Sequence, residues 1–280
     1  GIQRFAEETG HNTFILGPPR SDAALQVQIL EDLIAQDVDA ISVVPFSPET
    51  LEPVLQRAMA EGIVIITHEA SNQQNFNYDL EAFDNADYGA HLMDSLAECM
   101  GAEGEYAVFV GSLTSRTHNE WVDAAIARQR EAYPNMQLVG SKNESYDNQQ
   151  NAYAKTGELF RTYPELKGFL GSASTDVAGI GLAVEERGLE ERTCVFGTSL
   201  PSVSSQYLET GAVDMISFWD PADAGYAMNL LAIRALEGET VETGDDFGVP
   251  GYQAVLVRNS VVYGQAWVDV TRDIVGDYDF

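Results

Sequence analysis

The chain has 280 residues, and its 44 acidic and 15 basic side chains give a formal net charge of -29 at pH 7. A charge of this sign repels nucleic acid and anionic membranes, so neither is expected as a partner. Hydrophobic residues make up 45% of the chain, which is typical of a folded protein. The acids are scattered along expected helices, which favours a solvated acidic shell of the kind that suits high salt.

The first part of the chain alternates between short β-rich runs and stretches with helical periodicity, at the spacing of βα units. It opens with a helix that ends at Gly10, where a series of βα units should open with a strand, so we expect a first strand to be missing. Ser47 is the expected cap of a helix that begins with the sequence SPET. The expected elements after Gly10 are strand 12–16, helix 23–36, strand 40–44, helix 47–61 and strand 63–67.

A second series of βα units follows a glycine-flanked break at residues 101–104, where we place a boundary between two lobes. Proline or glycine ends most of its helices. The two series together predict an α/β protein. The expected elements are helix 85–100, strand 106–110, helix 119–133, strand 137–146, helix 149–163, strand 168–171, helix 176–187, strand 193–196, helix 202–209, strand 214–219, helix 222–236, and strands 254–257 and 261–263.

The two cysteines of the chain, Cys99 and Cys194, fall late in an expected helix and in an expected strand. The flanking patterns place them in different lobes, which disfavours a disulfide between them. We therefore expect two buried free thiols.

Polar side chains gather immediately after the expected strands. The carboxyl ends of parallel strands are where open α/β sheets bind ligands, so these side chains are the candidate binding residues. Several have a second interpretation, since His118, Asn119 and Asp176 also fall where a side chain caps a helix, and Trp219 suits core packing. The candidates are His68, Glu69, His118, Asn119, Thr175, Asp176, Thr198, Ser199, Trp219 and Asp220.

This mixture of carboxylates, amides, hydroxyls and an aromatic face suits a small neutral sugar or polyol. A carboxylate accepts hydrogen bonds from adjacent hydroxyls, and an aromatic ring covers the apolar C–H face of a sugar. Catalytic signatures such as GxSxG, a phosphate loop, HExxH and CxxC are absent from the sequence. Gly179 and Gly181 lack the context of a dinucleotide fingerprint and are interpreted as packing residues. We therefore expect a protein without enzymatic activity, cofactor or metal site.

Three stretches carry a resemblance to a known family: QVQILEDLIAQDVDAISVVPFSPETLEPVLQRAMAEGIVIITHEA, GAVDMISFWDPADAGYAMNLLAIRALEGE and the terminal DYDF. With them the chain resembles the periplasmic sugar-binding proteins of ABC importers, and within these the branch that includes autoinducer-2-binding and rhamnose-binding proteins. The resemblance implies the type I periplasmic binding protein fold, with two doubly wound Rossmann-like lobes, a hinge of three crossovers and ligand bound in the cleft. The expected first lobe is 1–103 with 221–259, and the second is 104–220 with 260–280.

The resemblance also implies a function. We expect a non-enzymatic, monomeric receptor that captures a pentose, deoxyhexose or sugar alcohol in the periplasm by hinge closure and delivers it to a membrane permease. The signal peptide for export would lie outside this chain. Glu69 stands where such proteins commonly have an Asp, and Thr117 and His118 stand where the autoinducer-2 receptors have Asp and Gln. These differences favour a sugar or polyol other than autoinducer-2.

Three alternatives stay open at this point. One is a signal receptor for an autoinducer-2-type molecule. Another is a sugar-converting enzyme on a (β/α)8 barrel, in which Glu69, His118 and Asp220 would be acid, base or metal ligands. The third is the effector-binding core of a transcription repressor, although the strongly negative charge argues against DNA as a partner.

Overall fold

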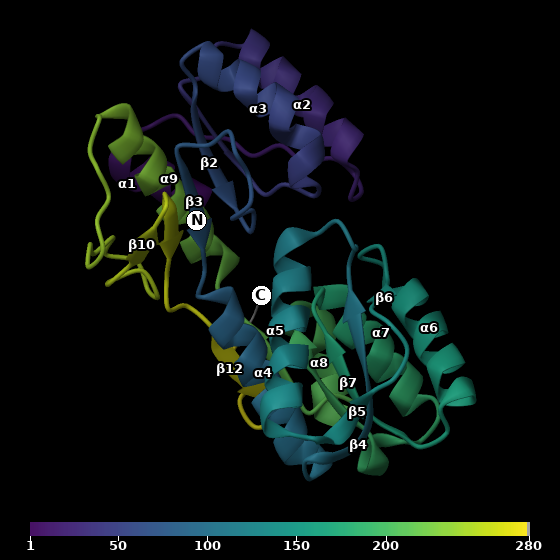
Figure 1. Cartoon of the computed structure of the whole chain (residues 1–280). Helices are drawn as coiled ribbons and strands as arrows, with labels where there is room; N and C mark the ends of the chain where they lie inside the picture. Colours follow the sequence, from purple (N-terminus) through teal and green to yellow (C-terminus); the bar gives the residue numbers. More distant parts are fainter. Residues whose placement is uncertain (279–280) are drawn as a thin grey trace. The chain divides into compact units, whose positions relative to one another are not determined.

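The computed structural model describes residues 1–278 and divides the chain into two compact units (Figure 1). Unit 1 comprises Gly1–Asp84 and Trp219–Trp267, and unit 2 comprises Asn85–Phe218 and Val268–Phe280. The last two residues, which end the DYDF stretch, lie outside the described part. The chain passes between the units three times, and each unit has its own open sheet. The predicted two-lobed α/β architecture is thus confirmed, and the alternative of a single closed barrel is wrong.

The units divide at positions that differ from the predicted boundaries. The predicted boundaries followed residues 103, 220 and 259, whereas the units divide after Asp84, Phe218 and Trp267. Helix α4 (Asn85–Met100) therefore lies in unit 2, where it packs on α5 and on three strands of the sheet. The glycine-flanked break is a tight turn within unit 2, in which Ala102 has a φ of 56° and donates its N–H to the carbonyl of Ala97.

Unit 1 is built on a five-stranded sheet in the order β1-β2-β3-β11-β10. All neighbouring strands are parallel except β10, which is antiparallel to β11. The elements of this unit are α1 (Ile2–Thr9), α2 (Ala23–Ala35), β1 (Ala40–Val43), α3 (Pro48–Ala60), β2 (Val64–His68), β3 (Tyr78–Glu81), α9 (Pro221–Leu236), β10 (Leu256–Arg258) and β11 (Val261–Tyr263).

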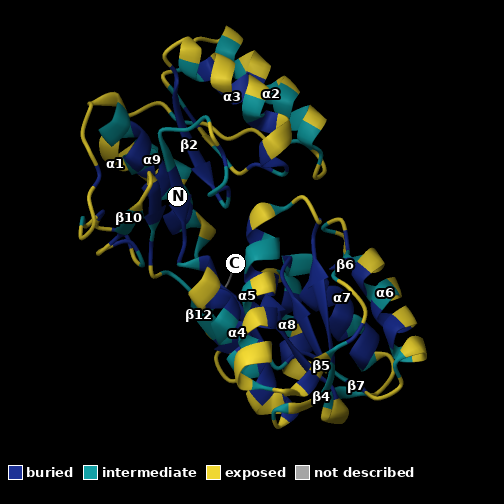
Figure 2. Cartoon of the chain, viewed as in Figure 1, coloured by how far each residue is buried: buried dark blue, intermediate teal, exposed yellow. Residues whose placement is uncertain are grey.

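Strand β2 is buried along its whole length because helices cover both faces of the sheet (Figure 2). Ile65 belongs to a core cluster with side chains of α2 and α3, whereas Val64 and Ile66 belong to a cluster with side chains of α9. This division follows from the alternation of strand side chains between the two faces. A strand covered on both faces reads as a continuous apolar run, and its first ionisable side chains, His68 and Glu69, stand at its carboxyl end.

Unit 2 is built on a seven-stranded sheet in the order β12-β9-β8-β7-β4-β5, with β6 also paired to β4. The strands are parallel except β12, which is antiparallel to β9. The elements of this unit are α4 (Asn85–Met100), β4 (Glu103–Val110), α5 (Arg116–Ala132), β5 (Asn135–Leu138), β6 (Asn143–Glu144), α6 (Gln149–Thr162), β7 (Leu166–Gly171), α7 (Ser174–Glu185), η1 (Glu190–Arg192), β8 (Cys194–Thr198), α8 (Pro201–Thr210), β9 (Met215–Phe218), β12 (Val268–Thr271) and η2 (Val275–Asp277).

The sheet of unit 2 is also covered on both faces. Ala107 and Phe109 of β4 pack in one cluster with side chains of α6, α7 and α8. Tyr106, one residue earlier, faces the other side, where its hydroxyl donates to Gln129 of α5 at 3.2 Å. Over the described residues, no helix is both long and apolar enough to cross a membrane.

Several predicted elements differ from the structure. Residues 12–16 form no regular strand, and the predicted strand 137–146 is divided into β5 and β6. Strands β3 and β12 were not predicted, since β3 has the sequence YDLE, in which acidic residues interrupt the apolar pattern. Helix α5 begins at Arg116, so His118 lies within its first turn rather than before the helix, and Asn119 is not its first residue.

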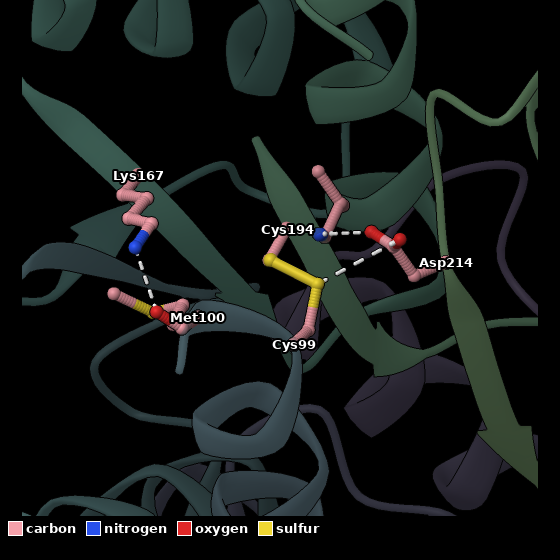
Figure 3. The surroundings of a disulfide bond; sticks show 6 residues. Cys99, Met100, Lys167, Cys194 and Asp214 are labelled. Atoms are coloured by element: carbon pink, nitrogen blue, oxygen red, sulfur yellow. Dashed lines mark hydrogen bonds between the residues drawn. A yellow bond between two sulfur atoms is a disulfide. The ribbon is translucent and has the colours of Figure 1, made fainter. Parts of the chain in front are cut away.

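The two cysteines form a disulfide, so the prediction of free thiols is wrong (Figure 3). Both residues lie in unit 2, because α4 packs on β8 and brings Cys99 to a Cα–Cα distance of 6.0 Å from Cys194. The carboxylate of Asp214 lies 3.8 Å from the sulfur of Cys99 and accepts the N–H of Val195 at 2.8 Å. The disulfide thus joins segments separated by 95 residues in the sequence.

Removal of the disulfide should destabilise the chain. The double variant Cys99→Ser, Cys194→Ser opens a covalent loop of 95 residues, and loss of a native disulfide typically costs about 2–5 kcal/mol of unfolding free energy. Urea unfolding of the parent and the variant measures this loss, with Glu98→Gln, at an exposed position of the same helix, as a control. If a thiol reagent detects two free thiols in the denatured, unreduced parent, the disulfide is contradicted directly.

The acidic surface should make stability depend on salt. With 44 acids against 15 bases, like charges repel in the compact state. Raising the ionic strength from 0.01 to 1 M shortens the Debye length from about 30 to about 3 Å, so the melting temperature should rise steeply with NaCl. Sucrose at the same osmolality is the control, because it stabilises proteins by being excluded from their surface and does not screen charge. A melting temperature that rises equally in sucrose and in NaCl would contradict a role for charge repulsion.

Candidate functional site

The carboxyl end of β2 in unit 1 presents two of the predicted residues, His68 and Glu69. Glu69 has a left-handed φ of 58°, which is uncommon outside glycine. The turn is held by Asp79, whose Oδ1 accepts from the Thr67 hydroxyl at 2.6 Å and from the Ala70 N–H at 3.3 Å. The backbone at Glu69 is thereby fixed where the strand leaves the sheet.

The imidazole of His68 is buried and held as a hydrogen-bond acceptor. Its Nδ1 lies 2.5 Å from the carbonyl oxygen of Leu80, so this nitrogen carries the proton and donates it. Burial lowers the pKa of His68 and keeps the ring neutral at pH 7. Its Nε2 has no hydrogen-bond partner among the described residues. A lone pair on a buried nitrogen is a site that a ligand hydroxyl can fill.

Trp219 and Asp220, both predicted, follow β9 and lie in unit 1. The indole of Trp219 meets His68 edge-to-face at 5.7 Å between ring centroids and Phe83 at 5.5 Å. These two contacts fix the indole beside the imidazole. Asp220 is the N-cap of α9, where one carboxylate oxygen accepts the N–H of Ala222 at 2.7 Å. Asp220 therefore has a structural role as a helix cap.

In unit 2, His118 and Asp147 meet over Gly111 at the carboxyl end of β4. A Cβ atom added to Gly111 would lie 2.1 Å from Asp147 Oδ1 and 2.9 Å from His118 Nδ1, so only glycine leaves room for both side chains. Burial lowers the pKa of His118, and the nearby Asp147 carboxylate acts weakly in the opposite direction. His118 Nδ1 has no hydrogen-bond partner among the described residues.

Asp147 owes its position to an unusual backbone. Tyr146 and Asp147 are consecutive residues with left-handed φ values of 57° and 48°. Such conformations cost of order 1–3 kcal/mol each in non-glycine residues and cluster at functional sites. The Tyr146 N–H donates to the Gly111 carbonyl at 2.7 Å, which ties this turn to the end of β4.

Asp176 is fully buried at the start of α7. Its Oδ2 accepts the N–H of Ala173 at 2.9 Å and that of Ser172 at 3.3 Å. Burial, together with the nearby carboxylate of Asp147, raises the pKa of Asp176 to about 7. The adjacent Thr175 hydroxyl is buried without a hydrogen-bond partner among the described residues. Each of these residues thus has a side-chain oxygen, Asp176 Oδ1 and Thr175 Oγ1, without a hydrogen-bond partner among the described residues.

The other three predicted residues of unit 2 have their polar groups occupied by the protein. The Asn119 amide donates to the Ser112 and Ser115 carbonyls at 2.9 and 2.7 Å, and its oxygen accepts from Lys142 at 2.9 Å. The Thr198 hydroxyl lies 2.9 Å from that of Tyr88. Ser199 is wholly buried, where its hydroxyl donates to the Ser174 carbonyl at 2.9 Å. These three residues stabilise the loops that carry the site.

Sequence reasoning missed Asp147 and Glu144. The expectation of a continuous strand 137–146 hid the turn that places Asp147 beside His118. Glu144 accepts from the Leu113 N–H at 2.8 Å and from the Ser112 hydroxyl at 3.2 Å, and so holds the loop after β4. The polar sequence ESYDN at the end of the expected strand is the signal that points to both residues.

The carboxyl ends of the two sheets share one chemistry. Each presents a neutral imidazole with an unused nitrogen and at least one carboxylate, so both are rich in hydrogen-bond acceptors. Over the described residues, no three His, Cys, Asp or Glu side chains lie together in a way that could hold a metal ion. Acceptors of this kind bind hydroxyl and amine donors.

The raised pKa of Asp176 should give stability a distinct pH dependence. A folded-state pKa of about 7 lies above the ordinary value of about 3.9, so the native state binds a proton between pH 8 and 5 that the unfolded state does not. This term stabilises the parent as pH falls, by up to about 1.4 kcal/mol per pH unit. Asp176→Asn removes the titration and keeps an acceptor for Ala173.

Urea unfolding of parent and variant at pH 8, 7, 6 and 5 measures the difference. Relative to Asp176→Asn, the parent should gain stability on acidification, and other titrating groups cancel in this comparison. Parallel pH profiles would show that Asp176 titrates near its ordinary pKa.

Comparison with known proteins assigns this chain to a family. A family model described as "Periplasmic binding protein domain" matches residues 1–240. The ribose import binding protein RbsB of Bacillus subtilis is 28% identical over 111 residues, which are 40% of this chain and 36% of that protein. The xylitol-binding protein of Mycolicibacterium smegmatis is 23% identical over 196 residues, which are 68% of this chain and 52% of that protein. The chain thus spans about half the length of these relatives or less.

Solved structures share the fold. LsrB from Clostridium saccharobutylicum, in complex with AI-2, has a TM-score of 0.91 at 19% identity, covering 100% of this chain and 94% of that one. An ABC transporter solute binding protein from Clostridium phytofermentas with bound L-rhamnose has a TM-score of 0.89 at 18% identity, covering 99% and 91%. The predicted resemblance is confirmed: this chain belongs to the periplasmic binding protein domain family.

Proposed function

We propose that this chain is a solute-binding receptor that takes up a small neutral sugar or sugar alcohol, such as a pentose, a deoxyhexose or a polyol, and delivers it to the permease of an ABC importer. The observation that carries the proposal is the pair of neutral imidazoles, His68 and His118, each with an unused nitrogen at the carboxyl end of a sheet. A molecule with several hydroxyl groups and no charge satisfies such acceptors.

The aromatic surface of unit 1 supports a sugar over a more polar solute. Trp219 lies beside His68, so one apolar face and one acceptor adjoin each other. A sugar ring has the matching arrangement, with C–H groups on its face and hydroxyls at its edge. Aromatic rings with a few placed polar groups are the usual lining of small-molecule sites.

The carboxylates at the two edges disfavour phosphorylated sugars and sugar acids. Glu69 lies beside His68 in unit 1, and Asp147 lies beside Gly111 at the edge of unit 2. An anionic ligand placed beside these groups would suffer repulsion in a low-dielectric setting, where one charge pair costs several kcal/mol. Hydroxyl donors form charge-assisted hydrogen bonds with the same carboxylates.

The relatives support the same class of ligand. Ribose and xylitol stand in the names of the two curated relatives, and both are small, neutral and polyhydroxylated. The disulfide supports export, because disulfides persist in oxidising compartments such as the periplasm and are rare in the cytosol. Delivery to a membrane permease, and action as a binding protein rather than an enzyme, follow from the same proposal.

Binding of a sugar should raise the melting temperature of the chain. A ligand at 100 times its dissociation constant adds about 2.7 kcal/mol to stability. Ribose, xylitol and L-rhamnose are the first probes for differential scanning fluorimetry, with ribose 5-phosphate as the anionic counterpart. For the probe that binds, Glu69→Gln in unit 1 and Asp147→Asn in unit 2 should each weaken affinity about 10-fold to 100-fold, because each removes a charge-assisted hydrogen bond.

Two matched variants serve as controls. Glu61→Gln and Glu209→Gln remove one exposed carboxylate from units 1 and 2 and should leave the affinity unchanged. If ribose 5-phosphate binds more tightly than ribose, the proposed ligand class is wrong. If the two site variants bind like the controls, the assignment of the carboxylates is wrong.

A further inference from the structure

Four aromatic side chains of unit 1 form a continuous row of edge-to-face contacts. The ring centroids of Trp267 and Phe83 lie 5.6 Å apart, those of Phe83 and Trp219 lie 5.5 Å apart, and those of Trp219 and His68 lie 5.7 Å apart. The ring planes of the three pairs cross at 69°, 81° and 82°. Aromatic pairs of this geometry stabilise each other beyond the area they bury. The orientation of each ring in this aromatic row therefore depends on its neighbours.

Three members of the aromatic row stand where the chain passes between the two units. Unit 1 is interrupted after Asp84, resumes at Trp219 and ends at Trp267. Phe83 is thus the last residue but one before the first passage, Trp219 is the first residue after the second, and Trp267 is the last residue before the third. The row therefore joins the unit 1 ends of all three connecting segments, which are far apart in the sequence.

The backbone also holds two of these segments together. The Ala266 N–H donates to the Ala82 carbonyl at 3.0 Å. These two residues directly precede Trp267 and Phe83, and they lie just beyond the ends of the parallel strands β11 and β3. The first and third segments are thus fixed side by side before they leave unit 1. Trp219, which belongs to the second segment, meets this pair through the ring of Phe83.

Phe83 is the central ring of the row. It is 1% exposed and contacts both indoles, whereas Trp219 and Trp267 are only partly buried. A side chain that touches a ligand keeps its orientation only when the residues behind it lock its rotamer by packing. Phe83 supplies this packing for Trp219, and Trp267 supplies it for Phe83. A buried ring held from both sides is therefore well placed to fix the partly exposed indole of Trp219.

We propose that Phe83 and Trp267 are positioning residues that hold the Trp219 indole in the orientation in which it covers the face of a bound sugar. This assignment rests on the proposed function, because it takes the sugar to bind beside Trp219 and His68. Phe83 acts by direct contact, and Trp267 acts through Phe83. Since the three rings belong to three different connecting segments, a sugar seated on Trp219 is energetically linked to all three segments, and the linkage is reciprocal.

Affinity measurements on matched variants test the role of the row in binding. Isothermal titration uses a panel of neutral sugars and sugar alcohols that includes ribose, xylitol and L-rhamnose. For a panel member that binds the parent, Phe83→Leu and Trp267→Leu should each weaken affinity about 3-fold to 10-fold, because each removes one edge-to-face contact. Trp267→Phe keeps a ring against Phe83 and should bind within about 2-fold of the parent.

Phe247→Leu is the control for a general loss of core packing, because Phe247 is another buried aromatic residue of unit 1, in the core cluster against which Trp219 packs. It should lower the melting temperature as Phe83→Leu does and leave the affinity unchanged. Fluorine NMR then reports on Trp219 without any sugar. The chain has three tryptophans, so labelling with fluorotryptophan gives three resonances, which single Trp→Phe variants assign. The Trp219 resonance should shift in Phe83→Leu and in Trp267→Leu, and it should stay in place in Phe247→Leu.

The outcomes separate this assignment from the proposed function. If the parent binds a sugar and Phe83→Leu binds it equally well, the positioning role is wrong and the proposed function stands. If Phe247→Leu loses as much affinity as Phe83→Leu, the effect is one of core packing, and the positioning role is again wrong. A Trp219 resonance that does not move in Phe83→Leu overturns it as well. If the parent binds no member of the panel, the proposed function fails, and the positioning role fails with it.

Discussion

The burial of parallel strands on both faces is the constraint on which the rest of this structure depends. Helices cover both sides of β2 and β4, so residues such as Ile65 and Phe109 have apolar neighbours on whichever face they point to. Ionisable side chains are then confined to the ends of the strands. In unit 1 this places His68 at the carboxyl end of β2, and in unit 2 His118 of α5 lies beside Gly111 at the end of β4. The candidate binding residues therefore lie at the strand ends, where polar side chains are tolerated.

The same burial fixes the protonation state of the site. Burial lowers the pKa of His68 and of His118 and raises that of Asp176 to about 7, so in each case the low dielectric favours the neutral form. In His68 one nitrogen is committed to the Leu80 carbonyl, so the other is offered as an acceptor. The net charge of -29 acts on a longer length scale, where it favours solubility and repels anionic solutes. Both effects support the proposed ligand, an uncharged donor of hydrogen bonds.

The sequence pattern was sufficient to predict the fold class and most elements, because the apolar runs of strands and the proline or glycine at helix ends are local features. It was not sufficient for contacts that depend on packing. The disulfide between Cys99 and Cys194 arises because α4 crosses β8, which local patterns do not specify. Asp147 was missed because two consecutive residues with left-handed φ, here Tyr146 and Asp147, have no strong sequence signal when neither is glycine. Ser199 and Asn119 stay predicted ligand contacts, and the structure shows that both also hydrogen-bond to loop carbonyls, since a polar side chain after a strand can serve either purpose.

An open sheet leaves unpaired N–H and C=O groups along its end strands, and the two units differ in how these groups are treated. In unit 2 the sheet continues beyond β4 to β5, and β12 closes the other side as an antiparallel strand. In unit 1 the sheet stops at β1, and Gln26 of α2 hydrogen-bonds to the backbone of Val44 and Phe46 just beyond the end of that strand. In the middle of β1, Ser42 is exposed, so the unpaired edge there is open to solvent.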